Sequence, residues 1–192
     1  VTMPKFPPKP VGEKGTLAVA VGDLPNSGSV NGEYVGFDIE LVRTFAQKEN
    51  IDLTIISLEF AALVAAVASG KADMIADCIA ITEERKQQIA FSDPYMEDKS
   101  AIIVLKKNIA TASAGKKIST VDDLARKKLG VPTGSVYDKF AMQRFPAATI
   151  QLYNELPDLT LALTSGRVDA GIHNLHVMKS LVRENPDLVL IS

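Results

Sequence analysis

The chain has 192 residues, of which 46% are hydrophobic and 23% charged, the usual balance of a globular protein with one large or two small domains. Its net charge of −2 offers no positive field for nucleic acid or an anionic membrane, and no apolar run reaches the roughly 18 residues that cross a bilayer. A single cysteine excludes disulfide-rich and zinc-ribbon folds.

The first half of the chain alternates short β-rich runs with helical patterns. We expect the proline-rich residues 1–15 to form an extended lead-in and the polar residues 22–32 to form a loop. Asp38 is predicted to cap a helix over 39–48, whose apolar residues share one face. The remaining predictions are strands over 16–21, 52–58, 73–79 and 100–107, a helix over 60–69 that ends at Gly70, and a short helix over 82–88 capped by Thr82.

The same alternation begins again after residue 107. Thr120 and Asp123 have the spacing of a capping box, which predicts a helix over 121–127. Further helices are predicted over 136–144, 159–164 and 175–184, and strands over 128–131, 148–153, 169–172 and 188–191. Strands that alternate with helices indicate parallel α/β sheets.

One stretch of sequence occurs twice in similar form. Residues 65–75 read AAVASGKADMI and residues 161–172 read LALTSGRVDAGI. In each, the glycine can end a helix in the left-handed conformation, and the basic residue that follows favours the helix C-terminus. Such turns occur in many α/β proteins, but together with the restart after 107 they favour two similar lobes, over 16–107 with a first crossing strand and over 108–192.

Short motifs follow one another in a recognisable order. They are GFDI at 36–39, SGKAD at 69–73, ITEER at 81–85 and AFSDPY at 90–95, then DL at 123–124, LGV at 129–131, GS at 134–135 and GRVDA at 166–170. In this order they resemble the extracellular solute-binding proteins, family 3, of the polar amino-acid ABC transporter class, from residue 15 to the end.

The resemblance implies the type II periplasmic binding protein fold, which has two α/β lobes joined by two crossing strands with the ligand in a central cleft. Members of the family usually continue with a second crossing strand and final helices that return to the first lobe. We expect this return to be missing from the chain or supplied from elsewhere.

An amino-acid ligand needs partners for a carboxylate and an ammonium group. A guanidinium binds a carboxylate through a planar pair of donors. Arg85 falls in the first turn of its helix, where the dipole disfavours a cation without another role. The resemblance implies that Arg85 holds the ligand carboxylate; the alternative is a surface ion pair with Glu83 or Glu84.

The resemblance also assigns roles to other residues. Gly134 and Ser135 begin a helix and would hold the same carboxylate, and Ser135 can be an ordinary N-cap at the same time. Phe60 would pack over the ligand side chain, or else belong to the core. Asp77, Cys78 and Ala80 would line the pocket, with Asp77 able to hold an ammonium group or to be a buried or capping residue.

The chain departs from the family at two places. Where the family has an acid for the α-ammonium group, Asn174 offers only a carbonyl, and in the first loop Asp23 stands beside the positions that usually contribute an acid and an aromatic ring. His173 and His176 are three residues apart, but no neighbouring cysteine or carboxylate pair completes a metal site. No cofactor is expected, because no nucleophile elbow, phosphate loop or dinucleotide motif occurs.

We therefore predict a non-enzymatic protein, periplasmic or extracellular with or without a membrane anchor, that binds an amino acid for a transporter permease. One alternative is the ligand-sensing domain of a larger membrane-associated receptor or cell-wall enzyme. A third is a dehydratase-like enzyme, with Asp77 as its acid or base. One fold serves many functions, so the fold alone does not decide among them.

Overall fold

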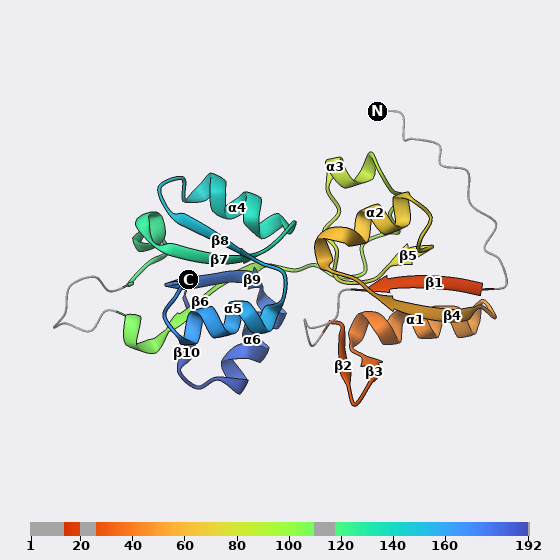
Figure 1. Cartoon of the computed structure of the whole chain (residues 1–192), viewed down its shortest axis with the longest axis horizontal. Coiled ribbons are helices and arrows are strands. Elements are labelled where there is room, and N and C mark those ends of the chain that lie inside the picture. The colour runs from red at the N-terminus through yellow and green to blue at the C-terminus, as the bar shows by residue number, and fades with distance from the viewer. Residues whose placement is uncertain (1–13, 20–25, 110–117, 192) are drawn as a thin grey trace. The chain divides into compact units, whose positions relative to one another are not determined.

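The computed structural model describes residues 14–19, 26–109 and 118–191. The chain forms two compact units, Val1–Glu97 and Asp98–Ser192 (Figure 1). Among the helices of the described residues, none has the length and apolar character that crossing a membrane requires.

The first unit is built on a parallel sheet with the strand order β4-β1-β5. The central strand β1 (Lys14–Val19) pairs in parallel with β4 (Asp52–Ser57) on one side and with β5 (Met74–Ile75) on the other. Because all three strands run the same way, their carboxyl ends meet at one edge of the sheet.

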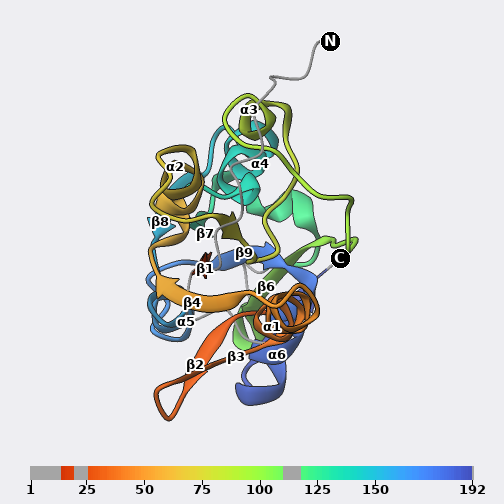
Figure 2. The same ribbon diagram turned by 90° about the vertical axis from the view of Figure 1, so that its right-hand side faces the viewer.

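Two helices cover opposite faces of this sheet, as Figures 1 and 2 both show. Helix α1 (Phe37–Lys48) places Ile39 and Val42 in a buried cluster with Leu53 and Ile55 of β4. On the other face, the 3-10 turn η1 (Phe60–Ala62) and helix α2 (Leu63–Ala68) pack with Ile56 and Ile75. The alternation of side chains along β4 and β5 therefore contributes to two buried clusters, one on each face.

The second unit contains a mixed sheet with the order β10-β6-β9-β7-β8. Strand β7 (Lys128–Pro132) is parallel to β8 (Thr149–Tyr153) and β9 (Ala170–Asn174). Strand β6 (Ser100–Leu105) is antiparallel to both β9 and β10 (Leu188–Ile191). The expectation of parallel sheets is thus correct for the three-stranded sheet of the first unit and wrong for β6 and β10.

Helices also cover both faces of the second sheet. Alternate residues of β6 divide between two clusters: Ile103 faces helices α5 (Leu156–Thr164) and α6 (Leu175–Glu184), whereas Val104 faces α4 (Val136–Arg144). The turn η3 (Val121–Arg126) lies on the α4 side; it falls within the helix predicted over 121–127 and is of the 3-10 type. The short turn η2 (Lys106–Asn108) follows β6.

The boundary between the units lies earlier than the sequence predicts. A first lobe that ends at residue 107 would contain β6, but the two units divide between Glu97 and Asp98. Because β6 is hydrogen-bonded on both sides to strands of the second unit, it belongs to that unit's sheet.

Two predictions about the region before α1 are wrong. The loop expected over 22–32 includes β2 (Gly28–Val30) and the turn at Asn31 and Gly32, which both have positive φ; β3 (Glu33–Val35) follows and completes a hairpin. The N-cap of α1 is Gly36, not Asp38, and Asp38 is fully buried in the first turn. A Cβ on Gly36 would lie 2.3 Å from the carbonyl oxygen of Asn26, so only glycine allows this close approach.

Other helices and strands differ mainly in length. The predicted strand over 73–79 is reduced to β5, the helix over 60–69 begins as η1, and the helix over 82–88 is α3 (Glu83–Lys86). Helix α5 begins three residues before its prediction, with Pro157 in its first turn, where the missing N–H costs no hydrogen bond.

The two Ser-Gly turns are alike bond for bond. In one, Gly70 N–H donates to Val67 and Lys71 N–H to Ala66; in the other, Gly166 N–H donates to Leu163 and Arg167 N–H to Ala162. The two glycines have φ of 77° and 74°. Both helices therefore end in the predicted left-handed conformation.

Candidate functional site

The carboxyl edge of the first sheet carries most of the predicted first-unit residues. Phe60 follows β4, and Asp77, Cys78 and Ala80 follow β5. In open α/β sheets, ligands bind beyond the carboxyl ends of the strands. The topology of the sheet, which the sequence pattern does not specify, thus brings these residues to one edge.

Arg85 is held in one position at this edge. Thr82 caps α3, its Oγ1 accepting from the backbone N–H of Arg85 at 3.2 Å as predicted. The guanidinium Nη1 donates to the carbonyl of Ala80 at 2.8 Å, and its carbon lies 5.7 Å from the centre of the Phe60 ring. Arg85 is half-buried, so the guanidinium lies over an aromatic face instead of extending into solvent. The structure brings Arg85, Phe60 and Ala80 together.

Phe60 has contacts on two sides. It packs against the buried cluster beneath α2 and also lies beneath the guanidinium of Arg85. Both predicted roles, core residue and ring at the site, are therefore compatible with its half-buried position.

Asp77 is buried and contacts the hydroxyl of Ser27, which donates a hydrogen bond to its Oδ1. Ser27 lies just before β2, so this bond ties the β2 segment to the end of β5. Cys78 follows with a φ of 46°, and its thiol lies 3.7 Å from the sulfur of Met96. Of the roles predicted for Asp77, the structure shows that of a buried residue with a hydrogen bond from the protein itself.

A second buried acid in the first unit is Asp38, which the sequence predicts only as a helix cap. Its side chain is buried in the first turn of α1 and accepts a 2.7 Å hydrogen bond from the phenol of Tyr95. Burial raises the pKa of the Asp38 carboxyl, and the bond from Tyr95 opposes that effect. Both residues stood in quoted motifs, but no local spacing connects them.

The carboxyl edge of the second sheet carries the remaining predicted residues. Ser135 caps α4: its buried hydroxyl accepts from Tyr137 N–H at 3.2 Å and donates to the carbonyl of Pro132 at 2.7 Å. Gly134 has a φ of 71°, and its N–H donates to Asp138 Oδ2 at 3.0 Å. The predicted N-cap role of Ser135 is confirmed. The Gly134 N–H, one of the groups predicted to donate a hydrogen bond to a ligand carboxylate, already has a protein partner.

Asn174 ends β9 and caps α6. Its side-chain carbonyl, the group considered for a ligand ammonium, accepts a 2.7 Å hydrogen bond from Val177 N–H. Asn174 is buried, and its side-chain amide acts as the N-cap of α6.

The two histidines have different surroundings. His173 is buried in β9, where its Nδ1 accepts from Asn174 N–H at 2.7 Å and its ring lies 5.3 Å from that of Tyr137. His176 is in the first turn of α6, with Nε2 4.0 Å from Asp98. Within 14–19, 26–109 and 118–191, no group of three or more His, Cys, Asp or Glu side chains is placed to hold a metal ion.

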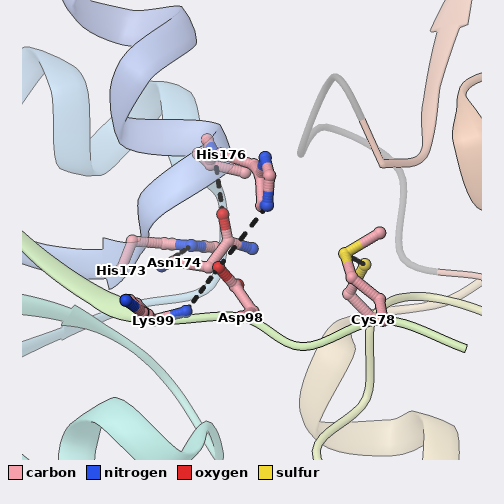
Figure 3. A network of polar contacts seen from close by, with 8 residues as sticks. Cys78, Asp98, Lys99, His173, Asn174 and His176 are labelled. Atoms are coloured by element: carbon pink, nitrogen blue, oxygen red, sulfur yellow. Dashed lines mark hydrogen bonds and ion pairs between the residues drawn. The ribbon is translucent and has the colours of Figure 1, made fainter. Parts of the chain in front are cut away.

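Figure 3 shows Asp98 where the second unit begins, linked to His176 and Lys99. Its Oδ1 accepts from the backbone N–H of Lys99 at 2.7 Å. Asp98 is not among the predicted site residues, and a charge just before a strong strand pattern is its only signal in the sequence. The predicted residue Asp23 lies outside the described residues.

The profile of the bacterial extracellular solute-binding proteins, family 3, matches residues 17–185. The chain belongs to this family. The resemblance seen in the motifs is thereby confirmed, and so is the mixed α/β fold class of type II binding proteins.

The chain is similar to several named proteins and solved structures. It is 33% identical to a probable histidine-binding protein of Campylobacter jejuni over 91% of the chain and 66% of that protein. An amino-acid ABC transporter substrate-binding protein of Streptococcus pneumoniae, solved with L-arginine, is 32% identical with a TM-score of 0.85 over 93% of this chain and 75% of the other.

A third relative is an ancestral amino acid-binding protein described as a precursor of cyclohexadienyl dehydratase. It is 26% identical, with a TM-score of 0.85 over 94% of this chain and 77% of the other. The chain thus spans just under two thirds of the Campylobacter relative and about three quarters of these solved structures.

Proposed function

We propose that this protein binds an amino acid outside the cytoplasmic membrane and delivers it to the permease of an ABC transporter. The observation that carries the proposal is the guanidinium of Arg85, fixed by Ala80 over the Phe60 ring at the carboxyl edge of the first sheet. A guanidinium held in this way is pre-organised to bind a ligand carboxylate.

The second unit supports the same function. Helix α4 begins at the carboxyl edge of its sheet, and the first-turn N–H groups of a helix attract an anion. In this proposal the carboxyl edge of each unit's sheet, taken by itself, carries groups that suit the carboxylate of an amino acid.

Isothermal titration calorimetry with the common amino acids, including arginine, histidine and cystine, tests the function. We expect at least one of them to bind, and Arg85→Gln to lower its affinity by about tenfold or more, since a hydrogen bond to a charged group contributes about 1.5–3 kcal/mol. Lys86→Gln is the matched control, because Lys86 is the neighbouring cation and pairs with Glu83 on the exposed side of α3. Binding of no amino acid by the folded chain would refute the proposal.

The proposal includes no chemical step. Asp77, the one residue considered as an acid or base, is buried and bonded to Ser27, which suits a structural role better than proton transfer. Incubation of the bound amino acid with the protein should leave it unchanged; turnover that disappears in Asp77→Asn would favour a dehydratase instead.

A further inference from the structure

An amino acid that binds at the carboxyl edge of the second sheet brings an ammonium group to an unfavourable place. Helices α4 and α6 both begin at this edge, since they follow the carboxyl ends of β7 and β9. The positive ends of both helix dipoles oppose a cation there. An ammonium group taken from water therefore needs a carboxylate partner.

Three acids near the strand ends are unsuited to this task. Asp77 and Asp38 of the first unit are buried and accept hydrogen bonds from Ser27 and Tyr95, respectively. In the second unit, Asp138 accepts from Gly134 through one oxygen, and its other oxygen is shielded from solvent. Asn174 carries no charge, and its carbonyl already caps α6.

Asp98 has the required position. Strand β6 is antiparallel to β9, so its beginning lies at the carboxyl edge, where Ser100 pairs with Asn174 and Leu175 N–H donates to the carbonyl of Lys99 at 2.8 Å. Asp98 directly precedes this pairing, and its side chain keeps 22% of its surface accessible. It is thus a partly exposed carboxylate beside the first turn of α6.

The contacts of Asp98 fix one oxygen and leave the other for a ligand. Both the 2.7 Å bond from Lys99 N–H and the 4.0 Å approach of His176 Nε2 are made to Oδ1 (Figure 3). No described residue is recorded as a hydrogen-bond partner of Oδ2. The carboxylate is therefore oriented by the chain before any ligand arrives.

The geometry points to Asp98 as the residue that binds the α-ammonium group of the amino-acid ligand. This assignment rests on the proposed function and adds a determinant for ligands that carry an ammonium group beside their carboxylate. Asp98→Asn is a mild substitution, because the amide oxygen can still accept from Lys99 N–H while the charge is removed.

The test uses calorimetry on the intact chain with two ligands: the amino acid that binds most tightly, and the same carboxylic acid without its α-ammonium group. We expect Asp98→Asn to lower affinity for the amino acid by about tenfold or more and to change affinity for the des-amino acid by less than about twofold. Asp122→Asn removes the same charge from η3, which precedes the amino end of β7, and should change neither affinity.

A rescue variant separates recognition from folding. In Asp98→Asn combined with Asn174→Asp, the carboxylate returns on the neighbouring strand and can still cap α6, so affinity for the amino acid should recover in part. An equal loss for both ligands, or no loss beyond that of Asp122→Asn, would overturn the assignment. If the unsubstituted chain binds no amino acid, the proposed function fails first and the assignment fails with it.

Discussion

The phenol of Tyr95 donates a 2.7 Å hydrogen bond to the buried carboxylate of Asp38, 57 residues earlier in the chain. Tyr95 stands shortly before the boundary between the units, in a stretch without regular structure, and its ring also lies 6.1 Å from that of Phe37. Burial raises the pKa of the phenol, and the nearby Asp38 carboxylate raises it further. This pair therefore anchors the end of the first unit to the start of α1.

Tyr95→Phe should destabilise the first unit by about 1–3 kcal/mol, because the buried Asp38 carboxylate would lose its donor while the ring remains. Chemical unfolding followed by circular dichroism measures the change. Tyr153→Phe is the control: its hydroxyl bonds to Gln151 on the same strand, where both side chains are partly exposed. A loss as large in Tyr153→Phe would contradict the importance of burial at Asp38.

The pKa of Asp38 predicts a dependence of stability on pH. The folded pKa is raised above 3.8 by burial, so as pH rises past 3.8 the unfolded chain releases this proton before the folded protein does. The unfolded state then binds fewer protons, and the free energy of unfolding falls over that interval. Asp38→Asn, which keeps an acceptor for Tyr95, should therefore gain stability relative to the unsubstituted chain between acidic and neutral pH; parallel stability curves would refute this.

Asp123 should show the opposite dependence. Its Oδ2 accepts from the backbone N–H groups of Ser119 and Thr120 at 2.7 and 2.8 Å, and these bonds lower the pKa of its carboxyl below 3.8. The stability that they contribute is present above 3.8 and is lost as pH falls through the folded pKa. Asp123→Asn should be less stable at neutral pH and match the unsubstituted chain in acid, whereas Asp122→Asn, which breaks an exposed pair with Arg144, should have little effect.

A substitution at Gly166 measures the free-energy cost of placing a side chain in the left-handed backbone conformation at a helix end, without a contribution from steric clash. Its φ is 74°, and nothing lies within 4 Å of the position of an added Cβ. Gly166→Ala should cost about 1 kcal/mol through its backbone alone. Gly166→Asn should cost less, because asparagine tolerates this conformation; an equal loss in the two variants, measured by thermal unfolding, would argue against that explanation.

Local patterns predicted the features that depend on neighbours in sequence. Helix α6 and strand β10 have the predicted bounds, and Thr82 and Ser135 cap their helices, because periodicity and capping involve residues a few positions apart. The Asn31-Gly32 turn also carried a hairpin signal, but strands of three residues are too short to show alternation.

The features that escaped prediction join distant parts of the chain. The direction of β6 depends on its pairing with β9 and β10, about which the apolar run SAIIVL contains no information. Likewise, the local sequence suggests an N-cap at Asp38 and a ligand residue at Asp77. It does not show that Asp38 accepts a hydrogen bond from Tyr95, or that Asp77 accepts one from Ser27. At the site, the sequence predicts which residue types are present, but it does not predict which polar groups form hydrogen bonds with one another.

The placement of β6 between β9 and β10 bears on how the protein is made. During synthesis, every strand of the first sheet is outside the ribosome once residue 75 has emerged, so the pairing of these strands can begin early. Strand β6, the first strand of the second unit, must wait for partners at residues 170–191. Until residues 170–191 have been synthesised, this apolar strand has both edges unpaired, so the nascent second unit is exposed to wrong strand pairing for longer than the first and has the greater need of chaperones.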